Sequence, residues 1–176
     1  APEPEPDGIS PYVITFTMSN NLLLIGDTSI VTIQFSEPVI GFSENDISSP
    51  NGTLSEASSL DSITWTMTFT PNDNIDNTTN ILILSDDYVD SAGNTGVSNT
   101  SSNYTIDTKS PHVVIFTMSN YSLGVGDTSI VTIQFSEEVT EFSQTDISSP
   151  NGTLSEASSF DNITWIMTFT PTEEIV

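Results

Sequence analysis

Carboxylates are the side chains of this sequence that are best able to do chemistry. The 176 residues include 24 Asp and Glu residues but a single Lys or Arg, and the formal net charge is -23. There is no cysteine, the one histidine (His112) stands where an internal repeat has Tyr12, and no base accompanies the many serine and threonine hydroxyls. We therefore expect a protein that is not an enzyme, in which carboxylates bind a hard cation such as calcium.

Seven oxygen-bearing residues are candidate calcium ligands. They are Asp7, Glu37, Asp87, Asp90 and Asn94 in the first part of the chain, with Asp107 and Glu137 at the corresponding positions of the second part. Calcium takes about six to eight oxygen ligands from carboxylates, carbonyls and water, and this set would supply much of that shell. The spacing is not that of an EF-hand loop. The alternative interpretation is that these acids are solvated loop residues of a very acidic protein.

An internal repeat organises the chain. Pro11 to Asp76 aligns with Pro111 to Val176, and 47 of these 66 positions are identical. A repeat of this length has the size of a domain rather than of a solenoid turn. We expect a Pro/Glu-rich linker over 1–8, a first module over 9–106, a linker over 107–110, and a second module over 111–176 that lacks its last strands.

Apolar and polar residues alternate within each module, which predicts β-strands with one buried face. The predicted strands are Val13 to Met18, 29 to 35, Gly52 to Ala57, 63 to 69, Asn80 to Leu84 and Asn103 to Ile106. Their predicted inward residues are identical in the second copy: Phe16, Met18, Val31, Ile33, Phe35, Trp65, Met67 and Phe69. We therefore predict an all-β protein made of antiparallel β-sandwiches.

Several motifs carry a resemblance to a known family. They are Gly26-Asp27-Thr28 leading into Val-Thr-Ile-Gln-Phe-Ser-Glu-Pro-Val, then Asn51-Gly-Thr-Leu-Ser, Ile63-Thr-Trp-Thr-Met-Thr-Phe-Thr-Pro, Asp90-Ser-Ala-Gly-Asn and Asp107-Thr-Lys-Ser-Pro. These motifs resemble the bacterial Ig-like tandem repeats of large calcium-dependent surface adhesins, the RTX-adhesin-type extender modules of ice-binding and biofilm adhesins. The resemblance implies tandem Ig-like antiparallel β-sandwiches, the second one incomplete in this chain, that act as non-catalytic, calcium-stiffened extenders of a cell-surface adhesin.

The topology of an Ig-like sandwich predicts where the candidate ligands meet. The first strand starts at the pole where the second strand ends and where the hairpin between the last two strands turns. That pole gathers Asp7, Glu37 and the hairpin over 85–94. In the second module it presents Asp107 and Glu137, so a bound calcium ion would fix the angle between consecutive modules. We expect calcium to act as a lock at these junctions.

The acidity of the chain excludes several partners. Nucleic acids and anionic membrane surfaces are bound through Lys and Arg residues, of which this chain has one, and no apolar run is long enough for insertion into a bilayer. We expect a secreted, cell-surface location and neighbouring copies of the same module as partners. Seven Asn-X-Ser/Thr sequons would accept N-glycans in an organism that glycosylates: Asn51, Asn77, Asn99, Asn103, Asn120, Asn151 and Asn162.

Two other functions stay open on the sequence alone. One is a ligand-binding tip, including an ice-binding threonine face, which the repetition disfavours because receptors tend to be singular and spacers numerous. The other is a subunit of a self-assembling extracellular filament or surface layer, in which another chain donates strands to the second module. An extender stays monomeric, whereas such a subunit polymerises.

Overall fold

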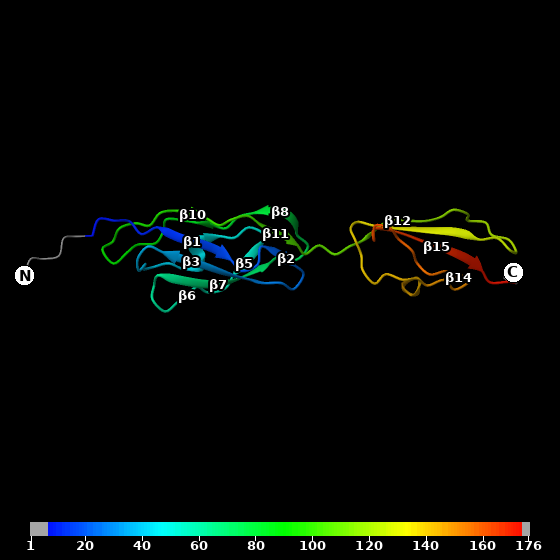
Figure 1. The fold of residues 1–176 in the computed structure, drawn as a ribbon, viewed down its shortest axis with the longest axis horizontal. Helices are drawn as coiled ribbons and strands as arrows, with labels where there is room; N and C mark the ends of the chain where they lie inside the picture. Colours follow the sequence, from blue (N-terminus) through cyan, green and yellow to red (C-terminus); the bar gives the residue numbers. More distant parts are fainter. Residues whose placement is uncertain (1–6, 174–176) are drawn as a thin grey trace, which may run out of the picture. The chain divides into compact units, whose positions relative to one another are not determined.

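A computed structural model describes residues 7–173, which form two compact units (Figure 1). The first unit reaches to Lys109 and the second begins at Ser110. Within the described residues, the regular structure is β-strand apart from two short 3-10 helices, Glu44–Asp46 and Gln144–Asp146. Neither is long or apolar enough to cross a membrane. The predicted all-β class is confirmed.

The larger sheet of the first unit contains the strands that were predicted from the strongest alternating patterns. Its order is β1 (Val13–Met18), β3 (Ser29–Phe35), β7 (Thr64–Pro71) and β5 (Gly52–Leu54), and β6 (Ser58–Ser59) also pairs with β7. All of these pairs are antiparallel. The register places Val13 opposite Phe35, so the start of β1 lies beside the end of β3.

Two smaller sheets complete the first unit. One has the order β2 (Leu22–Leu24), β11 (Tyr104–Asp107) and β8 (Asp76–Asn80), and the other has the order β10 (Asn99–Thr100), β9 (Ile83–Leu84) and β4 (Ile47–Ser48). β2, a strand that the alternating pattern did not predict, pairs with β11 in parallel, whereas β8 pairs with β11 antiparallel. The strand predicted over Asn80 to Leu84 is also interrupted, because the N–H of Leu82 bonds to Ser101 Oγ (2.9 Å) instead of continuing the ladder.

Side chains from all three sheets form the core of the first unit. Phe69 packs edge-on against Tyr104 with ring centroids 5.2 Å apart, and Phe35 packs against Tyr88 at 4.8 Å. Of the predicted inward residues, Trp65 and Met18 are only partly buried. The remaining six are buried: Phe16, Val31, Ile33, Phe35, Met67 and Phe69.

The described part of the second unit forms one sheet with the same register. Its order is β12 (Val113–Met118), β13 (Ser129–Phe135), β15 (Thr164–Pro171) and β14 (Gly152–Leu154). Phe116 is 57% exposed, whereas the identical Phe16 of the first unit is 8% exposed. In the first unit, residues 76–107 contribute core side chains such as Leu84 and Tyr104, and residues 110–173 contain no counterpart of that segment.

Candidate metal centre

Three segments of the first unit meet at the start of β1. Asp7 lies ahead of β1, Glu37 lies just after β3, and Asp90 lies in the loop between β9 and β10. Pairing of β1 with β3 brings the first two segments together. An isolated bridge between Ile40 and Val89, with Ile40 N–H donating to Val89 O at 2.7 Å, holds the loop beside them.

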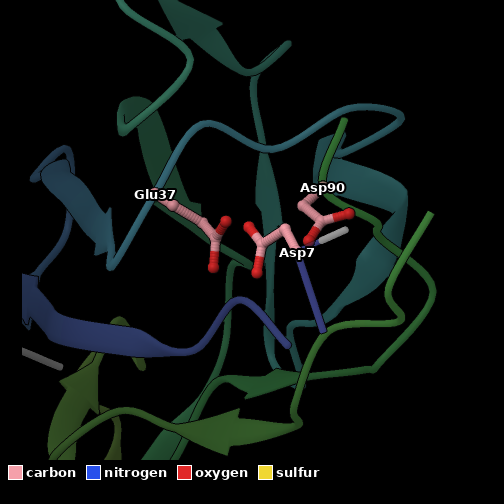
Figure 2. A group of neighbouring side chains, drawn as sticks. All are labelled: Asp7, Glu37 and Asp90. Carbon is pink, nitrogen blue, oxygen red and sulfur yellow. The ribbon is translucent and has the colours of Figure 1, made fainter. Parts of the chain in front are cut away.

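The three carboxylates at this place point toward one another (Figure 2). One oxygen from each of Asp7, Glu37 and Asp90 lies within 4.8 Å of the others. Asp7 is exposed, Glu37 is half-buried and Asp90 is buried. We call these residues the acidic triad. The convergence is the one that the topology of a sandwich predicted for these three residues.

Hydrogen bonds fix Asp90 in its loop. Its Oδ1 accepts the N–H groups of Ala92 and Asn94, both at 2.8 Å, and its Oδ2 accepts Asn94 Nδ2 at 2.7 Å. Burial opposes ionisation of this carboxyl, but the bonds from Asn94, Ala92 and Gly93 outweigh burial and place the pKa of Asp90 below its ordinary value. Asp90 is thus a preorganised, ionised member of the triad.

Asn94 joins the loop to the segment that leads into the unit. Besides its bond to Asp90, Asn94 Nδ2 donates to the backbone oxygen of Asp7 at 3.0 Å. Because the amide nitrogen faces both aspartates, Asn94 positions the triad in this structure. That Asn94 also supplies an oxygen ligand to calcium stays a prediction.

The surroundings of Glu37 disfavour ionisation of its carboxyl group. Burial raises the pKa of Glu37 above its ordinary value, and the nearby negative charges of Asp7 and Asp90 raise it further. Three carboxylates in such proximity repel one another when all are ionised. A cation between them would remove that repulsion, and hard oxygen ligands suit calcium or magnesium.

The other predicted ligands lie elsewhere. Asp87 is exposed, and its backbone N–H bonds to Ser85 Oγ at 3.4 Å; it is not part of the acidic triad. Asp107 ends β11 opposite Asp76 and Leu24. Glu137 follows β13 in the second unit. Their role as ligands stays a prediction.

Tyr88 is a positioning residue that the sequence reasoning did not single out. Its fully buried ring lies two residues before Asp90, and its hydroxyl donates to Val97 O (2.7 Å) and accepts Val97 N–H (3.1 Å). The chain passes so close to the ring that a Cβ at Gly96 would lie 2.2 Å from it. The only sequence signal was a tyrosine with a nearby glycine, which fits many loops equally well.

Comparison with known proteins identifies the repeats. Residues 7–106 and 107–176 each match the bacterial Ig-like domain, a domain that typically occurs in extracellular or surface proteins. No curated protein and no solved structure matched the chain. The two matches together span the chain from Asp7 to Val176, and the chain therefore belongs to the bacterial Ig-like domain family, of which it carries two tandem repeats.

Proposed function

We propose that this chain is a non-catalytic extender of a repetitive cell-surface adhesin, and that calcium bound at the acidic triad stiffens the point where the chain enters a module. Family membership supports a structural role outside the cell, because the same unit is repeated and bacterial Ig-like domains typically occur in surface proteins. An extender gains reach from each added copy without needing a reactive site.

Charge is the observation that carries the calcium part of the proposal. Asp7, Glu37 and Asp90 converge within a chain of net charge -23. Among the described residues, no side chain around them carries a positive charge. Their donor atoms are all hard oxygens, and Asp7 is exposed, so a hydrated ion can reach the site. Water and backbone carbonyls would complete the shell of about six to eight ligands that calcium takes.

Stiffening follows from the position of Asp7 in the chain. Asp7 belongs to the segment that leads into β1, whereas Glu37 and Asp90 belong to the folded unit. An ion shared by all three would tie the start of that segment to the unit more firmly than the bond from Asn94 Nδ2 to Asp7 O does. The aligned sequence Asp107-Thr-Lys-Ser-Pro would lead into the second module in the same way.

Calorimetry of the whole chain with calcium or with a chelator tests the proposal. Free calcium at about a hundred times the dissociation constant stabilises the folded state by about 2.7 kcal/mol, which raises Tm by about 10 to 20 °C for a domain of about 100 residues. Asp7→Asn and Asp90→Asn should remove most of that rise.

Asp87→Asn is the matched control, because it removes one negative charge from the same loop without touching the acidic triad. It should keep the calcium-dependent rise in Tm. An unchanged Tm on chelation would refute the calcium proposal, and so would an equal loss of response in Asp87→Asn and Asp90→Asn. A hydrolytic or transfer activity in the purified chain would refute the non-catalytic role.

A further inference from the structure

Lys109 is the single Lys or Arg among the 176 residues, and it is the last residue of the first unit. Proteases that cut after Lys or Arg, such as trypsin, bind the basic side chain in a pocket that contains a carboxylate. The peptide bond from Lys109 to Ser110 is therefore the one bond of this sequence that such a protease can recognise. Its surroundings in the fold decide how fast it can be cut.

The short segment that begins with Lys109 is accessible. Lys109, Ser110 and Pro111 are all exposed, and among the described residues no hydrogen bond holds the backbone of 109–111. The aligned residue of the first repeat, Ile9, is 67% exposed, so exposure of this position is a property of the repeat. Exposed segments of this kind are preferred sites of proteolytic cleavage.

The residue just before Lys109 is held through all of its polar groups. Thr108 is 5% exposed; its N–H donates to Ile75 O at 2.7 Å, and its backbone oxygen accepts Asn74 N–H at 3.2 Å. Its hydroxyl donates to Asn72 O at 2.7 Å and accepts Ile75 N–H at 3.0 Å. We call these contacts the Thr108 latch. They tie the residue that follows β11 to the loop between β7 and β8.

We propose that a protease specific for basic residues cuts this chain at the bond between Lys109 and Ser110, and that the Thr108 latch limits the rate. Residues on both sides of the bond must extend into the protease cleft, and Thr108 cannot do so while its contacts are intact. Water then adds across the peptide bond, which leaves a carboxylate on Lys109 and an ammonium group on Ser110. The first unit is not cut further by this protease, because it contains no other Lys or Arg.

The strength of the latch sets the expected rate. When opening and closing are fast, cleavage follows the fraction of chains in which the segment is open. Thr108→Val keeps the approximate size of the side chain but removes both hydroxyl bonds. Since each ordinary hydrogen bond changes the open fraction about fivefold, the two together should raise the cleavage rate about 25-fold. This inference does not depend on calcium at the acidic triad, because none of the latch residues belongs to the triad.

Digestion of the whole chain with a lysine-specific protease that is active in urea tests the proposal, with fragments identified by mass spectrometry and rates expressed relative to a short lysine peptide. The parent chain should give the fragments 1–109 and 110–176, slowly in buffer and fast in urea. Thr108→Val should be cut about 25-fold faster than the parent in buffer and at the same rate in urea. Parent cleavage that is as fast in buffer as in urea would overturn the proposal, as would equal rates for parent and variant in buffer.

Two further variants separate opening of the latch from unfolding of the whole unit. Thr17→Val makes the same chemical change at an exposed position of β1 and should be cut like the parent. Ile33→Val shortens a fully buried side chain of β3, which weakens the whole unit without touching the latch, and it should also be cut like the parent. Acceleration of Ile33→Val to the level of Thr108→Val would show that cleavage requires global unfolding, and the proposal would then be wrong.

Discussion

Replacing Gly96 by alanine is expected to destabilise the first unit and to disturb the loop that carries Asp90. A Cβ at this position would lie 2.2 Å from Cε2 and 2.3 Å from Cζ of Tyr88, well inside the separation of about 3.5 Å at which carbon atoms attract. The ring has no room to retreat, because it is fully buried and packs against Phe35 at 4.8 Å. Its hydroxyl is also held by Val97.

The cost can be worked out from these contacts. Overpacking a well-packed core costs about 1 to 3 kcal/mol, and loss of the hydrogen bond from the Tyr88 hydroxyl to Val97 adds about 1 kcal/mol. We expect Gly96→Ala to lower the free energy of unfolding of the first unit by about 2 to 4 kcal/mol, out of the roughly 5 to 15 kcal/mol that stabilises a domain of this size. The calcium response proposed for the acidic triad should weaken with it.

Urea unfolding followed by hydrogen-exchange mass spectrometry measures this loss, since peptides of the first unit are read separately from those of the second. Gly8→Ala is the control, because a Cβ there meets nothing within 4 Å and its φ is not positive; its unfolding curve should overlie that of the parent.

A double-mutant cycle tests the stated cause. Tyr88→Leu makes room for the new methyl group, so the double variant should lose less stability than the sum of the two single losses. Strictly additive losses would refute the steric reasoning, and so would a Gly96→Ala curve that overlies the parent curve.

Three further substitutions test local features of the loop before β7 and of the corresponding loop before β15. Ser62 has φ 59°, a conformation in which asparagine is several times enriched; Ser62→Asn should stabilise the first unit by about 0.5 kcal/mol, and Asn162→Ser should destabilise the second, both read from urea midpoints. Asp61 Oδ1 accepts the N–H groups of Thr64 and Ile63, and these bonds hold the pKa of Asp61 below its ordinary value. The ionised carboxylate therefore stabilises the folded state at pH values above the ordinary pKa of aspartate. This stabilisation is lost as the pH falls through the lower pKa of Asp61 in the folded state. Asp61→Asn should therefore lower the urea midpoint at neutral pH, with the difference closing in acid; a constant difference at all pH values would contradict the assignment.

The alternating patterns predicted the strands of the larger sheet because each has one face in the core. In β3, Val31, Ile33 and Phe35 are buried as their spacing requires. The same reasoning failed between Asn80 and Leu84, since the break there depends on Ser101, a residue distant in sequence whose hydroxyl takes the N–H of Leu82. Parallel pairing of β2 with β11 likewise depends on the path of the chain between them, and the residue pattern of the two strands does not indicate it.

The sequence by itself determined the repeat, the all-β class and the meeting of Asp7, Glu37 and Asp90, because antiparallel topology decides which strand ends share a pole. Only the tertiary structure separated Asp90 from Asp87, since the turn bonded by Ala92 and Asn94 directs one carboxylate inward and leaves the other in solvent. It also decided which distant segment covers the inner face of β1. Phe16 is buried in a core to which residues 76–107 contribute side chains, and the local sequence around Phe16 carries no information about that segment.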